Sequence, residues 1–268
     1  MVFSPCVVSA VLALPALAAG MDSVESDPAA RIALVTGATG RTGSLLYARL
    51  KADSRIGTVR ALVTSIEKAR STLRCSKCDP SEGIYLGNVT QPSTLTAAMQ
   101  GVTALAIAVG ASPFSSSELQ RATEFDGVEN QVRALAAGGG AAFATELRVV
   151  LCSSMGTTSP SPKPEQGGSI LFWKLNAEAF LGASGVGSVV VKPCGLGGKA
   201  KKTLLVGHDD TLLQTSPPLV AREDVAAVMA EAVARRSVNL RFDLCSKEGP
   251  PTTDLGALLA AASLPWQN

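Results

Sequence analysis

Three glycines, Gly37, Gly40 and Gly43, recur in the segment LVTGATGRTG, between an apolar run and a segment with helical spacing. In such a turn the first glycine permits a tight bend and the second lets the backbone approach a pyrophosphate. The third lets the helix pack closely on the strand. The helix N-terminus adds N–H donors and a partial positive charge. We therefore expect a dinucleotide phosphate here, against the alternative of a tight turn without a ligand.

The end of the second apolar run bears on which dinucleotide binds. NAD enzymes often carry an acidic residue there, bonded to the ribose 2′-hydroxyl. This chain has Thr64 and Ser65 at that place, and Arg41 lies inside the glycine turn. Lys68 and Arg70 follow shortly, and they fit a solvated helix face equally well. Because a guanidinium can clamp a 2′-phosphate, we expect NADP(H) rather than NAD(H).

The elements that must position these residues alternate along the chain. Short apolar runs predict strands at 31–37, 57–65, 83–89, 102–110, 147–154 and 186–195. Amphipathic segments predict helices at 43–52, 66–73, 92–100, 117–138, 170–180, 222–233 and 253–262, with Gly138 ending the long one. This order predicts an α/β fold, a Rossmann-like doubly wound parallel sheet with helices on both faces.

The domain organisation expected from this pattern has three parts. Residues 1–30 form an N-terminal extension, 31–200 the NAD(P)-binding Rossmann domain, and 201–268 a small C-terminal segment that completes the fold on the substrate side. Within that last part we expect a hairpin over 202–215, turning at His208–Asp210 with His208 exposed to solvent.

Composition excludes some partners. The formal net charge of the 268 residues is only +2 and no long basic run occurs, so nothing calls for nucleic acid or an anionic membrane. The six cysteines are scattered in a chain long enough to fold without staples, so we expect mostly free thiols. The segment CSKC (Cys75–Cys78) is expected to be an ordinary loop, because zinc would need two further ligands.

The N-terminus leaves the compartment open. The apolar run 6–20 ends near Ala16-Leu17-Ala18, which resembles a signal-peptidase site, but Lys and Arg are absent before Arg31. The run is too short for a stable transmembrane segment. Residues 21–30 are acidic, and Met21 is an alternative start. A cytoplasmic or plastid location, with or without a cleaved N-terminal signal, remains open.

The chain resembles the atypical short-chain dehydrogenases/reductases, in particular the NmrA-like NAD(P)-binding group that includes many plant and algal plastid proteins. The likeness spans about residues 31–235 and rests on VTGATGRTG, GNVTQP, FDGVEN, VVLCSSMGTT, FWKLNAE, KPCGL and LLVGHDDTLLQT…VAREDVA, in family order. It implies a set of cofactor-binding residues: Gly37, Thr39, Gly40, Arg41, Thr42, Gly43, Thr64, Asn88, Val89, Ala108, Val109, Gly110, Ser153, Pro193, Cys194 and Gly195. Asn88 stands where the family usually has Asp, and Thr64 where relatives often have the Arg that grips a 2′-phosphate.

The family's catalytic pattern is a Tyr that donates a proton and a Lys four residues later that lowers the Tyr pKa and bonds the ribose. By the resemblance, those places hold Phe172 and Asn176. Lys174 lies about 200° round the helix from that site and is expected at the surface. The segment Tyr47–Lys51 matches the letters, but it lies after the glycine turn, away from the nicotinamide. Ser154, at the end of the fifth strand, is the remaining candidate for catalysis.

Two functions stay open. The first is an NADP(H)-dependent reductase of an unidentified hydrophobic or conjugated small molecule, because hydride transfer needs mainly proximity and the cofactor carries the hard step. The second is a non-catalytic NAD(P) binder, a redox sensor or protein-docking module, since the Tyr acid is missing.

Overall fold

A computed structural model of the protein describes residues 28–139, 147–158 and 170–264. Its main feature is an eight-stranded sheet in which only the last strand runs antiparallel. In spatial order the strands are β3 (Ile84–Leu86), β2 (Thr58–Val63), β1 (Ile32–Thr36), β4 (Ala104–Ile107), β5 (Arg148–Cys152), β6 (Gly187–Pro193), β10 (Leu240–Lys247) and β8 (Thr203–Gly207). The predicted Rossmann-like fold is confirmed.

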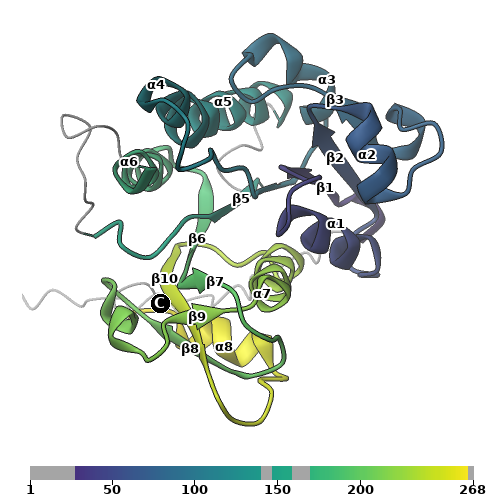
Figure 1. The fold of residues 1–268 in the computed structure, drawn as a ribbon. Coiled ribbons are helices and arrows are strands. Elements are labelled where there is room, and N and C mark those ends of the chain that lie inside the picture. Colours follow the sequence, from purple (N-terminus) through teal and green to yellow (C-terminus); the bar gives the residue numbers. More distant parts are fainter. Residues whose placement is uncertain (1–27, 140–146, 159–169, 265–268) are drawn as a thin grey trace, which may run out of the picture.

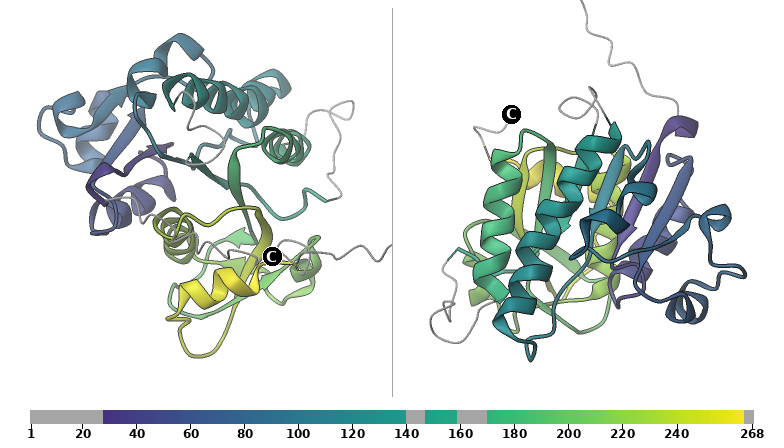
Figure 2. Two further views of the ribbon diagram at one scale, coloured as in Figure 1. Left: turned by 180° about the vertical axis from the view of Figure 1, so that it is seen from behind. Right: turned by 90° about the horizontal axis from the view of Figure 1, so that it is seen from above.

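Helices cover both faces of this sheet (Figures 1 and 2). The helices are α1 (Gly43–Lys51), α2 (Ile66–Leu73), α3 (Thr96–Met99), α4 (Ser117–Arg121), α5 (Gly127–Gly139), α6 (Ile170–Ala183), α7 (Arg222–Ala234) and α8 (Leu255–Ala261). One core layer joins α1, α7 and α8 to the sheet through residues such as Leu46, Met229 and Phe242. The other joins α3, α5 and α6 through Leu135 and Leu181. In the described part of the chain, no helix is both long and apolar enough to cross a membrane.

The long helix expected at 117–138 forms, with one irregularity. A π-helical turn, η4 (Ala122–Asp126), joins α4 to α5. Such turns insert an extra residue and often mark functional sites. The helix ends at Gly139, one residue past the expected stop at Gly138. A Cβ on Gly138 would lie 2.7 Å from the Met99 carbonyl oxygen. Gly138 therefore serves close packing on α3.

The predicted hairpin over 202–215 does not form. β8 is followed by a 3₁₀ turn, η7 (Thr211–Gln214), and pairs instead with β10. Two short strands, β7 (Gly195–Leu196) and β9 (Leu219–Val220), pair outside the main sheet. His208 is half-buried rather than exposed, with Nδ1 3.1 Å from the Arg241 carbonyl oxygen.

The expectation of mostly free thiols is also wrong for the described residues. Cys75 pairs with Cys78 and Cys194 with Cys245, with Cα atoms 5.0 and 5.2 Å apart, within the span of a disulfide. Cys152 remains a free thiol. The CSKC loop is further held by Glu82, whose carboxylate accepts hydrogen bonds from three successive amides of residues 76–78. These bonds and the Cys75–Cys78 disulfide fix the shape of the loop.

Candidate functional site

The glycine turn lies where β1 ends and α1 begins, next to β4. β1 stands between β2 and β4, so the strand order reverses direction along the chain at this point, which is where open α/β sheets bind ligands. Gly37 has φ +69°, and a Cβ there would lie 2.5 Å from the Ala108 carbonyl oxygen. A Cβ on Gly43 would lie 2.1 Å from the Gly37 carbonyl oxygen. Both positions therefore require glycine.

This turn opens into a cleft of about 330 Å³ at the carboxyl edge of β1, β2 and β4. Thr42 makes no side-chain cap to α1, which leaves the first turn of that helix suited to an anion. Nine of the expected cofactor residues line the cleft: Gly37, Thr39, Gly40, Thr64, Asn88, Val89, Ala108, Val109 and Gly110. Lys68 and Thr123 also line it, and the latter comes from the π-helical turn. These residues fit a dinucleotide.

The remaining expected cofactor residues lie outside this cleft. Arg41 is exposed, and Thr42 is buried beneath the turn. Pro193 and Cys194 are buried, with the Cys194 Sγ against Met155 and bonded to Cys245, whereas Gly195 is exposed. Ser153 is buried and its hydroxyl donates to Glu178.

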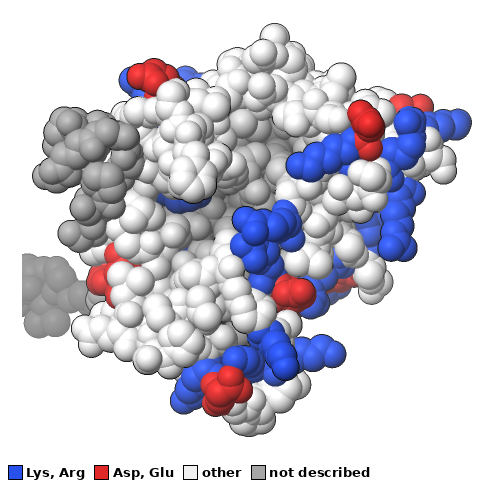
Figure 3. All heavy atoms as spheres, viewed as in Figure 1, with Lys and Arg blue, Asp and Glu red and all other residues white. Residues whose placement is uncertain are grey.

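Two polar residues shape the end of the cleft near β2 and β3. Ser65 caps α2 by accepting the Lys68 amide at 3.1 Å, so the helix begins at the end of β2. The Lys68 side chain is then carried beside Thr64 at the cleft wall. The Asn88 amide oxygen accepts the amide and hydroxyl of Thr90, which holds Asn88 in place. Figure 3 shows the face drawn in Figure 1, with a hollow in the middle and Lys and Arg gathered over α2.

The most unexpected group is Lys174 on α6. Its ammonium pairs with the Glu124 carboxylate at 2.7 Å, and the two side chains are only 13% and 3% exposed. The other Glu124 oxygen accepts the Ala111 amide at 2.7 Å, just after Gly110 of the cleft. Burial works against the charge of Lys174, but Glu124 outweighs it, so the Lys174 pKa lies above its ordinary value. The expectation of a surface Lys174 was wrong.

Lys174 shares one face of α6 with Glu178. One turn later, Glu178 accepts the Ser153 hydroxyl and Arg241 Nε, the latter at 2.8 Å. Residues four apart lie on the same face of a helix, so Lys174 and Glu178 both face the end of β5. The Asn176 amide instead donates to the Phe172 carbonyl oxygen at 2.8 Å, within the helix. Sequence reasoning missed Lys174, although its spacing to Glu178 was a usable signal.

Two smaller groups complete this end of the site. Ser154 is half-buried, and its hydroxyl donates to the Met155 carbonyl oxygen at 2.9 Å. The Cys152 thiol has a raised pKa, chiefly because of burial, with Lys174 acting in the opposite direction. It is therefore held as the neutral thiol.

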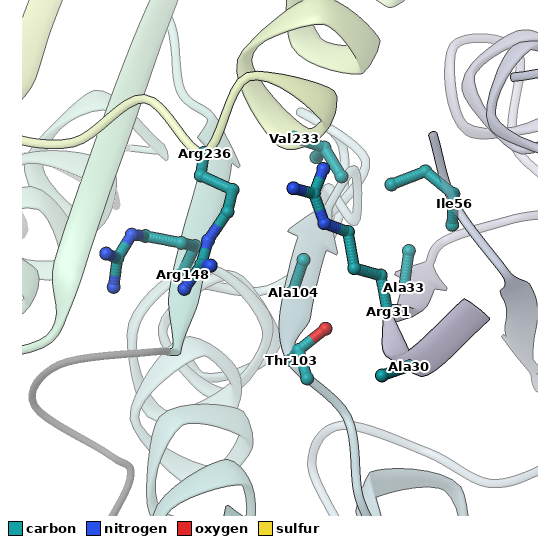
Figure 4. Close-up of a pocket in the computed structure, with 9 residues that line it drawn as sticks. All are labelled: Ala30, Arg31, Ala33, Ile56, Thr103, Ala104, Arg148, Val233 and Arg236. Atoms are coloured by element: carbon teal, nitrogen blue, oxygen red, sulfur yellow. The ribbon is translucent and has the colours of Figure 1, made fainter. Parts of the chain in front are cut away.

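A second cavity, of about 160 Å³, lies at the opposite, amino edge of β1 and β4 (Figure 4). Its rim carries Arg31, Arg148 and Arg236. Arg31 donates to the Ala234 carbonyl oxygen at the end of α7, and Arg148 to that of Leu147. The cavity is remote from the glycine turn and brings no nucleophile or acid–base pair together.

Comparison with known proteins agrees with this geometry. A family model described as NAD(P)H-binding matches residues 37–236, from the glycine turn past α7. The chain belongs to this NAD(P)H-binding family. Among curated members, it is 31% identical to an uncharacterized chloroplastic protein of Arabidopsis thaliana over 84% of this chain and 73% of that protein. It is 30% identical to sanguinarine reductase of Eschscholzia californica, over 87% of this chain and 96% of that enzyme.

Solved structures show the same fold. A putative NAD-dependent epimerase/dehydratase of Bacillus halodurans superposes with a TM-score of 0.67 at 21% identity, covering 86% of this chain and 99% of that one. The NADPH complex of the quinone oxidoreductase QOR2 of Escherichia coli superposes with a TM-score of 0.54 at 18% identity, covering 86% and 74%. The protein is an atypical, NmrA-like short-chain dehydrogenase/reductase that binds a nicotinamide cofactor and is built like a reductase.

Proposed function

We propose that this NAD(P)H-binding protein is an NADP(H)-dependent reductase of a hydrophobic or conjugated small molecule, and that it transfers hydride without a Tyr acid. The observation that carries the proposal is the buried Lys174–Glu124 pair at the carboxyl edge of β4 and β5, beyond the glycine turn. Through Glu124 and the Ala111 amide, the pair fixes an ammonium next to Gly110 of the cleft, where it would meet the ribose of a bound cofactor. The 30% identity to a named reductase supports the same conclusion.

The residues fit the cofactor in the following roles. The glycine turn and the N-terminus of α1 would hold the pyrophosphate, and Asn88 and Val89 the adenine side. Lys174 would approach the ribose next to the nicotinamide. The bound cofactor would supply the hydride, and the chain's own groups would orient it, exclude water and hold protons. Ser154 follows the end of β5 and is half-exposed, whereas Ser153 is buried and bonded to Glu178, so we propose Ser154 as the group that bonds the acceptor oxygen or nitrogen.

The choice of NADP(H) over NAD(H) rests on the wall of the cleft at the end of β2. Thr64 and Lys68 line it, and no carboxylate from the described residues does so. A carboxylate would favour a ribose 2′-hydroxyl, whereas an ammonium favours a 2′-phosphate. We also propose Arg41, which is exposed in the glycine turn outside this cleft, as a second cation for the 2′-phosphate.

The position at which a Tyr acid would stand follows from counting back four residues from Lys174. In the Tyr-x-x-x-Lys spacing the Tyr place is Ile170, at the start of α6. Ile170 has no proton to give, so acceptors that need an acid at that point are disfavoured. Electron-poor rings and conjugated systems, which take hydride and collect a proton from water, remain suitable. Residues 201–268, which supply β8, α7, β10 and α8, are proposed to shape the acceptor side.

The experiment is NADPH oxidation by the full chain across quinones, flavins, enones and iminium compounds, with Ile170→Tyr as a matched variant. Turnover of at least one electron-poor acceptor is expected, together with new carbonyl reduction by Ile170→Tyr. Tight NADPH binding with no turnover anywhere would overturn the reductase proposal.

That outcome would favour the second candidate, a non-catalytic NAD(P) sensor, which the apolar Ile170 in the Tyr place supports. A sensor must bind the oxidised and reduced cofactor with different affinity. For the compartment, we propose the plastid, because the Arabidopsis relative is described as chloroplastic. Fluorescence microscopy of the full chain carrying a C-terminal fluorescent protein tests this, and a uniform cytoplasmic signal would contradict it.

A further inference from the structure

A buried ionic cluster stands beside the cofactor site and takes no part in the proposed hydride transfer. Lys192 on β6 is fully buried, and its Nζ lies 2.7 Å from Asp210 Oδ1 and 3.3 Å from Asp243 Oδ1. It also donates to the Thr158 hydroxyl at 3.1 Å. Thr158 and Asp210 accept hydrogen bonds from this ammonium, whereas Asp243 pairs with it by charge alone, because neither Asp243 oxygen has a hydrogen-bond partner among the described residues. A charge this deep is tolerated only when its partners are held in place.

Asp210 connects this cluster to the segment that follows β5. One carboxylate oxygen accepts from Lys192, and the other accepts the Thr158 amide at 2.9 Å. The Gly156 amide lies close enough to the same carboxylate to help lower its pKa. Asp210 reaches this position from a turn in which Asp209 and Asp210 have φ of 55° and 64°. Such left-handed backbone is disfavoured for residues other than glycine and persists only where surrounding contacts determine it.

The segment after β5 is fastened at alternate residues and turns at Met155–Gly156. The Ser153 and Met155 amides continue the ladder with β6, donating to the carbonyl oxygens of Val191 and Pro193 at 2.8 and 3.0 Å. Ser153, Met155 and Thr157 are buried, whereas Ser154 between them is half-exposed. The position of Ser154 therefore depends on anchors on both sides of it, the ladder before and the Asp210 contacts after.

We propose that Lys192 and Asp210 act as a clamp, defined by their ion pair, that positions the segment Gly156–Thr158 and through it Ser154 beside the nicotinamide end of the cleft. This inference rests on the proposed function. Neither residue contacts cofactor or acceptor, so both are positioning residues.

Asp210 is the partner through which the clamp acts. Asp243 is fully buried on β10, and burial is the main cause of its raised pKa, with Lys192 opposing. For Asp210, burial alone would raise the pKa, but the bonds from Lys192, Gly156 and Thr158 lower it overall. Asp210 is also the closer partner of Lys192, hydrogen-bonded at 2.7 Å against 3.3 Å for the Asp243 ion pair. Replacing Asp210 by Asn keeps the side-chain volume and leaves Lys192 its second carboxyl partner, so the fold is expected to survive.

The test compares Asp210→Asn with Asp209→Asn in the full chain. Asp209 is the adjacent residue of the same turn. Its side chain is 74% exposed, and its carboxylate makes only a long ion pair, 3.7 Å, with the Arg241 guanidinium. In Asp210→Asn, hydrogen exchange at the Gly156 and Thr158 amides should rise about tenfold. The kcat should fall about 10- to 100-fold because Ser154 is displaced. The KM for NADPH should stay within about twofold, since the glycine turn lies on the other half of the sheet. Asp209→Asn should match the wild type in all three.

The clamp is overturned if Asp210→Asn and wild type show the same exchange at these amides, or if kcat is unchanged while exchange rises. A rise in KM for NADPH with kcat unchanged would also overturn it. If the wild type turns over no acceptor, the proposed function fails separately. NADPH fluorescence then decides on the clamp: the wild type should enhance the emission of bound NADPH, and Asp210→Asn should lose that enhancement at unchanged Kd. Equal enhancement would reject the clamp.

Discussion

Replacing Lys174 by Met should destabilise the protein strongly. The Lys174 ammonium and the Glu124 carboxylate are 2.7 Å apart, with side chains 13% and 3% exposed. Removing the cation leaves Glu124 buried, with the Ala111 amide as its one remaining hydrogen-bond donor among the described residues. Breaking a buried pair typically costs about 3–5 kcal/mol, and the residual exposure of Lys174 places the value near the lower end. For a domain of this size that lowers Tm by about 6–12 °C.

Urea denaturation followed by circular dichroism measures the loss, with Lys51→Met as the control. Lys51 is an exposed lysine on α1, and its replacement should change the free energy of unfolding by less than about 0.5 kcal/mol. The double variant Lys174→Met/Glu124→Gln should recover much of the loss, since the orphaned charge is gone. A loss below about 0.5 kcal/mol for Lys174→Met would refute the buried pair.

The pH dependence of this effect follows from the raised pKa of Lys174. A lysine whose folded pKa exceeds its unfolded value contributes stability that is fully present below the unfolded pKa of about 10.4. That stability is lost only as pH rises through the folded pKa. The difference between wild type and Lys174→Met should therefore be constant from about pH 7 to 9 and shrink above about pH 10.4. A difference that already disappears at pH 8 would contradict the assignment.

Three further predictions concern the cofactor cleft and the Lys192–Asp210 clamp. Gly37→Ala, whose Cβ would lie 2.5 Å from the Ala108 carbonyl oxygen, should weaken NADPH binding at least about tenfold in calorimetry; unchanged affinity would remove the phosphate from this turn. Lys68→Ala should weaken NADPH binding about tenfold and leave NADH within about twofold, and equal losses for both would mean that Lys68 does not contact a 2′-phosphate. Because the pKa of Asp210 is lowered, its stabilising contribution is present above the unfolded value of about 3.9 and is lost as pH falls through the folded value. Asp210→Asn should therefore unfold with a shallower pH dependence below about pH 4, and parallel acid-unfolding curves would contradict this.

Strand and helix positions could be predicted because hydrophobic periodicity determines them locally. β1, β4 and β6 are short apolar runs, and two acidic residues in the first turn of α7 mark its N-terminus. The prediction of a hairpin at His208–Asp210 failed because the pairing of β8 depends on a distant strand. β10 pairs with β8 across more than thirty residues, a choice that tertiary packing makes and local pattern does not.

The candidate site divides in the same way. The glycine turn was readable because its spacing carries a steric requirement, and Gly37 and Gly43 meet it. Lys174 was expected at the surface because counting from Phe172 and Asn176 turned it away from the site. Its burial depends on Glu124, which the π-helical turn η4 brings opposite Lys174. That turn and the disulfide between Cys194 and Cys245 both depend on contacts between distant segments.

Calorimetric titration of the full chain with NADPH, NADP, NADH and NAD tests the cofactor site most directly. We expect saturable one-to-one binding of NADPH, with affinity at least about tenfold higher than for NADH because Lys68 lines the cleft where a 2′-phosphate would lie. Binding of none of the four cofactors would contradict the assignment of the glycine turn and its cleft as a nicotinamide-dinucleotide site. Tighter binding of NADH than of NADPH would contradict the proposed preference for NADP(H).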